Sequence, residues 1–145
     1  MQKYSVEEVL SLFSFSVPVQ VRYSDIDGYM HVNNGVYFSY LEHARAYYLY
    51  EVCGWDVMQT GTVVASITID YRTPIHAMDK PSVYVRTTEI GKSSFVMEQV
   101  VMGIAADGQQ KIFAQARTVM VAVDMKTMKP VSVPTEYAVK MLPSS

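Results

Sequence analysis

The stretch that decides the fold is residues 33–52, which read NNGVYFSYLEHARAYYLYEV. Its apolar residues recur at intervals of three or four, the spacing of one face of an α-helix: Tyr37, Leu41, Ala44, Tyr48 and Val52. Charged side chains are few in this stretch: Glu42, Arg45 and Glu51. The pattern therefore predicts a long, largely buried helix over residues 33–52 that stops at Gly54.

The sequence on both sides of this helix is typical of β-strands. Residues 17–23 alternate apolar and polar side chains, as a half-buried strand does. After the helix, four segments have strand character: residues 62–71, 82–90, 95–104 and 111–124. Residues 105–108 join the last two and read AADG, a hairpin signal. We therefore expect an α+β fold, in which an antiparallel sheet with its last four strands in meander order wraps around one long central helix.

Two short helices are expected near the ends of the chain. Ser5 and Glu8 have capping-box spacing, and the helix they begin is expected to face the core with four apolar side chains: Val6, Val9, Leu10 and Phe13. Residues 135–141 form the second helix, which follows Pro134 and is expected to cover an edge. Because one helix protects only one face of a sheet and the strands leave edges, we expect the subunit to need a partner.

Length and composition narrow the class of protein. The 145 residues are half apolar, which is enough for one domain over residues 1–145. A net charge of -2 gives no reason to expect nucleic-acid binding. The longest uncharged stretch, between Glu8 and Arg22, is too short to span a membrane and is interrupted by Pro18. The lone Cys53 cannot form an internal disulfide, so a cytoplasmic location is expected.

The segment that carries the chemistry is residues 22–34, RYSDIDGYMHVNN, between the first strand and the long helix. It gathers carboxylates, an imidazole and two amides in one turn. Free backbone N–H groups at a helix start can hold an oxyanion while a nearby carboxylate attacks or activates water. A thiol leaves with a pKa of roughly 8.5, so a thioester can be cleaved without a strong general acid. The turn therefore favours acyl transfer from a thioester.

At this point the sequence resembles the hotdog-fold acyl thioesterases of the 4-hydroxybenzoyl-CoA thioesterase type. The matching segments cover nearly the whole chain: YSDID at 23–27, HVNN at 31–34, VYFSYLEHAR at 36–45, VVASITIDY at 63–71, Pro74, Asp79 and PVSVP at 130–134. The resemblance implies a hotdog fold and hydrolysis of an acyl-CoA to free acid and coenzyme A, with no cofactor beyond the substrate. It also implies a homodimer or a dimer-of-dimers tetramer, with active sites at the dimer interface.

The resemblance assigns the catalytic carboxylate to Asp27, as nucleophile or general base, and places the N–H that polarises the thioester carbonyl near Asn34. His31 is expected either to hold water or the thioester oxygen, or to act as a helix cap or a packed hydrogen-bonding residue. Tyr29 and Asn33, in the same turn, are expected to contact the substrate, although Asn33 is also the best candidate for a helix cap. A turn or capping role for Asp27 is the structural alternative.

Further substrate contacts are expected outside this turn. Ser66 and Thr68 lie on the polar face of the strand at 62–71, where alternation alone also explains them. Lys92 and Ser93 lie in a turn that resembles the segment meeting the coenzyme A nucleotide in the family. Glu42, on the long helix, is a second candidate carboxylate, or an ion-pair partner of a neighbouring basic residue.

Two departures from the family pattern leave alternatives open. Met30 stands where many relatives have a small residue, and Tyr29 stands where acyl-carrier-protein thioesterases have an Asn. The second departure favours coenzyme A over acyl carrier protein. A non-catalytic acyl-CoA-binding module and a hydratase remain alternative functions. A metal site is not expected, because Asp25, Asp27 and His31 do not make a complete ligand set.

Overall fold

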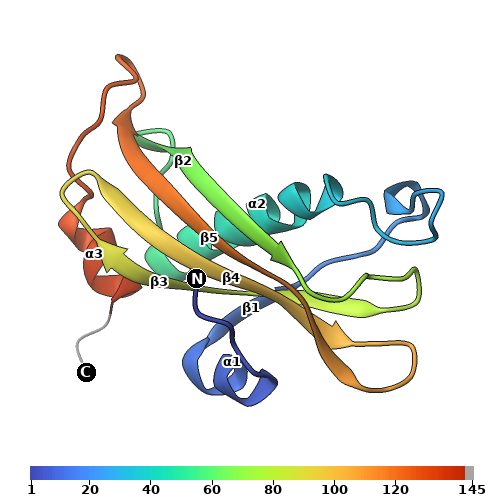
Figure 1. Cartoon of the computed structure of the whole chain (residues 1–145). Helices are drawn as coiled ribbons and strands as arrows, with labels where there is room; N and C mark the ends of the chain where they lie inside the picture. Colours follow the sequence, from blue (N-terminus) through green and yellow to red (C-terminus); the bar gives the residue numbers. More distant parts are fainter. Residues whose placement is uncertain (143–145) are drawn as a thin grey trace.

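A computed structural model describes residues 1–142 of the chain. Its elements follow in the order α1 (Val6–Leu12), β1 (Phe15–Pro18), η1 (Tyr23–Asp25), α2 (Val36–Tyr48), η2 (Leu49–Cys53), β2 (Thr60–Tyr71), β3 (Lys80–Ile90), β4 (Ser94–Ile104), β5 (Gln110–Asp124) and α3 (Thr135–Met141). The expected α+β architecture is confirmed, because one antiparallel sheet curls around the long helix α2 (Figure 1).

The five strands lie in the order β1-β3-β4-β5-β2, and all neighbours are antiparallel. The expected meander is correct for β3, β4 and β5. It is wrong for β2, which pairs with β5 from Thr60 to Tyr71 instead of lying beside β3. The place beside β3 is taken by β1. The exchange leaves β2 as a twelve-residue edge strand.

The main core lies between α2 and the concave face of the sheet. Leu41, Ala44 and Tyr48 of α2 are almost completely buried, and they pack with Val85 of β3 and Phe113 of β5. These helix residues share one face because they are spaced at three and four. Side chains from every second position of a strand meet that face. This packing fixes the direction of α2 and thereby the position of its N-terminus.

The helix is shorter and less regular at its end than the sequence predicts. Regular α-helix ends at Tyr48, and a wider π-helical turn continues from Leu49 to Cys53. The helix ends at Gly54, which adopts the left-handed conformation with φ of 64°. Gly54 is therefore the expected stop, since a residue without Cβ adopts this conformation at little cost.

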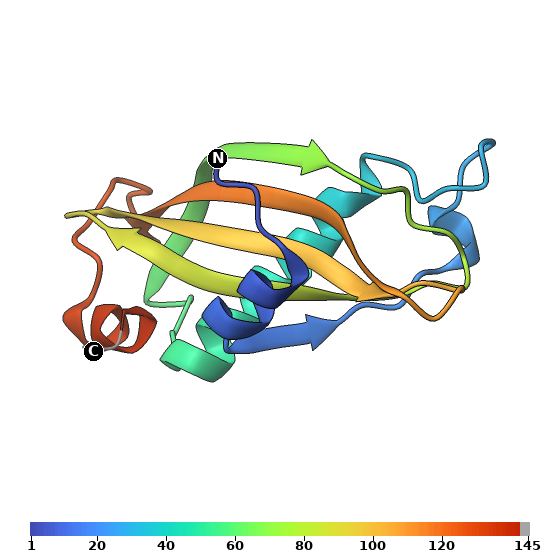
Figure 2. The same ribbon diagram turned by 60° about the horizontal axis from the view of Figure 1, so that its bottom comes forward.

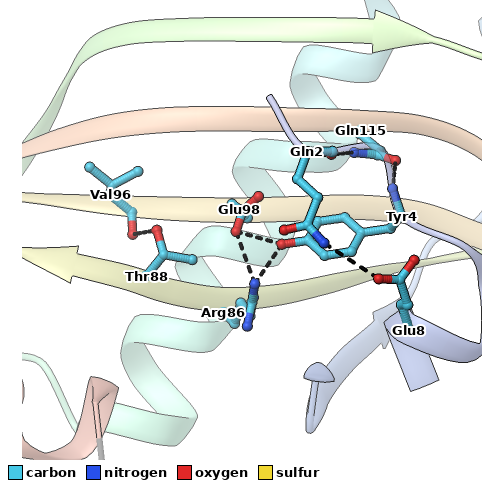
Figure 3. Close-up of polar contacts among 8 residues, drawn as sticks. All are labelled: Gln2, Tyr4, Glu8, Arg86, Thr88, Val96, Glu98 and Gln115. Atoms are coloured by element: carbon cyan, nitrogen blue, oxygen red, sulfur yellow. Dashed lines mark hydrogen bonds and ion pairs between the residues drawn. The ribbon is translucent and has the colours of Figure 1, made fainter. Parts of the chain in front are cut away.

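The opposite face of the sheet is covered by the N-terminal segment and α1 (Figure 2). Ser5 and Glu8 form the expected capping box. Val9 and Phe13 are buried against this face, but Leu10 is exposed, contrary to the expectation. Tyr4 anchors the segment, because its hydroxyl donates to Glu98 Oε1 at 2.7 Å and its backbone N–H donates to Gln115 (Figure 3).

The first strand lies earlier than expected. Alternation predicts a strand over residues 17–23, whereas β1 covers Phe15–Pro18 and residues 23–25 form a 3₁₀ turn. The partner strand explains the difference: β3 begins at Lys80, so the ladder ends where Pro18 meets Ser82. One further bond, from Val19 N–H to the Pro81 carbonyl, continues the pairing. The chain is then free to turn into the segment before α2.

The C-terminal helix α3 occupies the expected residues, Thr135–Met141. It packs against η2 and β3 and closes the end of the core. Tyr137 stacks on Trp55 with ring centroids 4.6 Å apart. The core is therefore sealed at the end of the sheet that lies far from the N-terminus of α2 (Figure 1).

Candidate active site

The segment between β1 and α2 is a compact double turn. A bridge between Ile26 and Val32 closes it, and the Asp27 N–H donates to the His31 carbonyl at 2.9 Å. Met30 adopts the left-handed conformation, with φ of 65°, which a residue with a side chain rarely adopts. The Val32 N–H donates to the Ile75 carbonyl at 2.8 Å, so the turn is fastened to the loop before β3.

Asp27 is half-buried, and only one of its carboxylate oxygens is occupied. Oδ1 accepts the Tyr29 N–H at 2.9 Å, an arrangement that fixes the side chain over its own turn. No residue of the described chain donates to Oδ2. Tyr29 and Met30 extend into solvent beside it. The geometry leaves an oriented carboxylate with one oxygen available to a water or an acyl carbon.

Asp25 has a different role, because it ties the turn to α2. Its Oδ2 accepts the Tyr40 hydroxyl at 2.6 Å and the Arg22 N–H at 3.0 Å. Burial, and to a lesser degree this hydrogen bond to a carboxylate, raises the pKa of Tyr40 well above its usual range. The Asp25 carbonyl also accepts the Asn33 N–H at 2.9 Å. Both the side chain and the backbone of Asp25 are thus engaged in holding the turn.

The start of α2 supplies a free backbone donor. Asn33 Oδ1 accepts the Gly35 N–H at 2.8 Å, so its side chain caps the turn. The Asn34 carbonyl accepts the Tyr71 hydroxyl at 2.9 Å. The Asn34 N–H has no hydrogen-bond acceptor within residues 1–142, and the residue is exposed. This N–H group is therefore free to bind an oxyanion.

A small cavity of about 160 Å³ lies beside this N–H group. Its walls include His31, Asn34, Tyr37 and Tyr71. The two tyrosine rings meet edge to face, with centroids 4.9 Å apart. Burial raises the pKa of Tyr37 to about 12, so this wall is a neutral phenol at physiological pH. The cavity combines aromatic walls with one imidazole at the N-terminus of a helix.

A second histidine, His76, packs against this turn and is not among the residues expected at the site. Its ring meets the ring of His31 edge to face, with centroids 4.9 Å apart. Its Nδ1 lies 3.6 Å from Oδ2 of the buried Asp79, which also accepts the His76 N–H. The three-residue spacing of His76 and Asp79 indicates a turn at residues 76–79. Nothing in the sequence of that turn shows that His76 packs on His31.

The remaining predicted residues are not gathered around the turn. Ser66 and Thr68 lie on the edge strand β2, near a bulge between Val64 and Ser66. Lys92 and Ser93 lie in the β3–β4 turn, at the other end of the sheet (Figure 1). Since β3 has eleven residues, about 35 Å separates its two ends. Within one chain, Lys92 is too distant to share a site with Asp27.

Glu42 does not lie in the turn that holds Asp27. It lies about two turns into α2 and lines a different cavity, together with Arg45.

Across residues 1–142, no group of three or more His, Cys, Asp or Glu side chains is arranged to hold a metal ion. None of the helices in that part of the chain is long and apolar enough to cross a membrane.

A family model described as the thioesterase-like superfamily matches residues 21–141. The chain is 30% identical over 128 residues to the acyl-CoA thioesterase YbgC of Haemophilus influenzae, with 84% of this chain and 90% of the relative covered. It is 29% identical over 135 residues to the long-chain acyl-CoA thioesterase FadM of Escherichia coli, with 85% and 93% covered.

Among solved structures, a thioesterase from Thermus thermophilus complexed with coenzyme A and Zn is 34% identical to this chain. The comparison has a TM-score of 0.74 and covers 89% of this chain and 92% of that one. The agreement in sequence and in structure confirms the expected hotdog fold and the resemblance on which it rested.

Proposed function

The chain belongs to the thioesterase-like superfamily, and from this premise we propose that it hydrolyses acyl-CoA thioesters to a free carboxylic acid and coenzyme A. The observation that carries the proposal is the pairing of two free groups in one turn. Asp27 keeps one carboxylate oxygen unoccupied, and the Asn34 N–H has no protein acceptor in the described chain. These are the two groups that thioester hydrolysis requires.

The roles follow from charge. The Asn34 N–H, at the positive end of α2, stabilises the oxyanion that forms on the thioester carbonyl. The free oxygen of Asp27 either attacks the acyl carbon or takes a proton from the attacking water, and both roles require the ionised carboxylate. His31 lies on the wall of the adjoining cavity and is the residue we assign to the thioester oxygen or the water. Asn33 and Tyr29 support the turn through Gly35 and Asp27.

The reaction uses no cofactor in this proposal. Water supplies the oxygen of the new acid, the C–S bond breaks, and the thiolate needs little assistance as a leaving group because its pKa is only about 8.5. We place the reaction in the cytoplasm. The single cysteine, Cys53, is buried and unpaired, which agrees with a reducing compartment.

We further propose that the working form is a homodimer paired through β2, alone or within a dimer of dimers. A long strand whose outer edge is unpaired is a ready site for a second copy. Two-fold pairing makes the two β2 strands antiparallel, so Tyr71 of one copy lies near the Thr60 end of the other. The Lys92 turn lies at that end of the sheet. Pairing therefore brings Lys92 and Ser93 of one copy towards Asp27 of the other, where they are placed to meet coenzyme A phosphates.

The test of the activity is thiol release from a panel of acyl- and aryl-CoA thioesters. Asp27→Asn is expected to lower kcat by roughly a hundredfold or more, because the side chain keeps its shape but loses its charge. Asp56→Asn is the matched control, since Asp56 Oδ1 accepts the Met58 N–H at 3.0 Å in the same local arrangement. The control is expected to retain full activity. If the protein binds thioesters without releasing thiol, or if Asp27→Asn matches the parent, the hydrolase proposal is wrong.

The test of the shared site is complementation. Asp27→Asn and Lys92→Glu are each expected to be impaired as homodimers. In a mixed dimer, one site combines an intact Asp27 with an intact Lys92, so random mixing should restore roughly a quarter of the parental activity. Light scattering should give a mass of two or four times 16.3 kDa. A mass of one chain, or the absence of recovery on co-expression, contradicts the shared site.

A further inference from the structure

A second cavity lies between the latter half of α2 and the edge strand β2. Its volume is about 350 Å³, which is within the range of small-molecule sites. Most of its walls are apolar: Leu49, Trp55, Val57, Val64 and Met120. Two charged side chains, Glu42 and Arg45, also line it. A cavity with apolar walls and two charges on one helix has no role in the hydrolytic turn described above.

Arg45 is buried without a charged partner. Only 6% of the residue is exposed, and its Nη1 donates to Gln99 Oε1 at 3.2 Å. Gln99 is neutral, and its own Nε2 is committed to the Leu41 carbonyl. Within residues 1–142 no carboxylate lies within 4 Å of the Arg45 guanidinium. Burial lowers the pKa of Arg45, which expresses the cost of a cation in this position.

Arg45 lines the cavity and keeps two side-chain nitrogens without a partner in the described chain. Nε and Nη2 make no hydrogen bond to any residue that the structure describes. They are also not enclosed, because the fully buried unpaired side-chain atoms of the described chain belong to Arg86 and Thr118. Two free donors on a planar guanidinium match the two oxygens of a carboxylate. The cavity thus presents a cation that an entering anion can reach.

Glu42 lies one turn earlier on α2 and is exposed. Its charge partly offsets the effect of burial on the pKa of Arg45, but the two side chains are not within ion-pair distance. The side chains of Tyr50 and Val57, which also line the cavity, are exposed.

We propose that this cavity receives the far end of an acyl group that carries a carboxylate, held by Arg45. The preferred substrates are then CoA thioesters of dicarboxylic acids, and the inference rests on the proposed hydrolase function. Apolar walls accept the methylene chain, whereas the guanidinium pairs with the terminal carboxylate. An unsubstituted acyl chain of the same length would leave the buried charge without a partner.

The helix gives an approximate length for this acyl group. Gly35 and Arg45 are ten residues apart, so about 15 Å of helix separates them. Long side chains on a helix lean towards its N-terminus, so the Arg45 guanidinium lies closer to Gly35 by at most the length of the side chain, about 6 Å. A separation of about 9–15 Å corresponds to roughly seven to twelve carbon atoms at the spacing that bonds of about 1.5 Å allow. Suberoyl-CoA, the eight-carbon diacid thioester, is therefore the shortest substrate to compare with its unsubstituted counterpart, octanoyl-CoA.

The test compares kcat/KM for suberoyl-CoA and octanoyl-CoA in the parent and in Arg45→Met, which keeps an unbranched side chain without charge. The parent is expected to prefer suberoyl-CoA, and the variant is expected to lose at least tenfold of that preference while its activity on octanoyl-CoA is maintained or raised. Glu42→Gln is expected to increase the preference, because it removes a like charge from the opening. An unchanged ratio in Arg45→Met overturns the proposal.

A binding measurement separates this inference from the hydrolase proposal. Free suberate is expected to raise the Tm of the parent, with octanoate as the matched control, and to leave the Tm of Arg45→Met unchanged. Suberate binding without thiol release from any thioester would support the cavity and contradict the hydrolase. If both thioesters are hydrolysed at equal rates and suberate does not change the Tm, the hydrolase proposal is supported and the cavity proposal is contradicted. If Arg45→Met does not fold, the two parental comparisons decide alone.

Discussion

The two carboxylates at positions 25 and 27 stand in different surroundings, and replacing each by asparagine should separate stability from catalysis. Asp25 accepts two hydrogen bonds, from the Tyr40 hydroxyl and the Arg22 N–H. A hydrogen bond to a charged group contributes about 1.5–3 kcal/mol, against about 0.5–1.5 kcal/mol for a neutral one. Loss of the charge in Asp25→Asn should therefore lower the free energy of unfolding by about 2 kcal/mol, or the Tm by roughly 6 °C.

Asp27→Asn should behave in the opposite way. The asparagine oxygen can still accept the Tyr29 N–H, so the turn keeps its local bond. The free energy of unfolding should change by less than about 0.5 kcal/mol. The unoccupied oxygen, however, is replaced by a neutral amide that can neither attack carbon nor take a proton from water. The kcat for thiol release should fall by roughly a hundredfold or more.

Both quantities can be measured on the same samples. Trp55 is the single tryptophan and is buried, so its fluorescence reports unfolding in urea. Thiol release is measured at room temperature, where both variants remain folded. The reasoning is refuted if Asp27→Asn is destabilised as strongly as Asp25→Asn, or if Asp25→Asn loses as much kcat as Asp27→Asn at unchanged stability. In either case the division of roles between the two carboxylates is wrong.

Three further predictions concern stability and reactivity. Gly103→Ala should destabilise the protein by about 3 kcal/mol or more in urea titration, because a Cβ at this position would collide with the Lys80 carbonyl oxygen; an unchanged midpoint contradicts this close approach. Ser5→Ala should cost about 1 kcal/mol by removing the cap of α1, measured as a lower Tm, whereas Ser11→Ala should have little effect. Burial raises the pKa of Cys53 to about 11, so Ellman's reagent at a pH of about 8 should label it only after unfolding. The same shift makes the folded state favour the neutral thiol, so its contribution to stability is complete below a pH of about 9 and is lost as the pH rises towards 11. Rapid labelling of the native protein contradicts both statements.

Features with a local cause could be predicted from the sequence. The capping box at Ser5, the stop at Gly54 and the hairpin at residues 105–108 each depend on contacts within a few residues. Gly108 adopts a φ of 86°, as the Asp-Gly signal implies. The strands after the long helix begin within two residues of their predicted starts, because their side-chain alternation is clear.

Features that depend on distant partners could not be predicted in this way. The alternation in residues 62–71 is equally compatible with pairing to β3 or to β5, and the bulge between Val64 and Ser66 changes which side chains share a face. The strand β1 is limited by the point at which β3 begins. Periodicity in a segment does not reveal its neighbour, so these two expectations were wrong.

The histidine contact shows the same limit within the site. His76 lies next to His31 because Asp79 holds the loop before β3 in place, with its two oxygens accepting the N–H groups of His76 and Ala106. A buried carboxylate thus links the β4–β5 hairpin to the loop that packs on His31. His31, the turn of His76 and Asp79, and Ala106 belong to three different segments, and the sequence alone gives no reason to group them.

The free polar groups along α2 point to where a substrate lies. A chain selected only for folding satisfies its polar groups internally, since each unpaired group taken out of water is costly. Here the Asn34 N–H at the start of α2 and two nitrogens of Arg45 in its latter half have no acceptor in the described chain, yet both remain accessible. One group suits a developing oxyanion and the other a carboxylate. An acyl group with a negative charge at its far end satisfies both at once, which a neutral acyl chain cannot do.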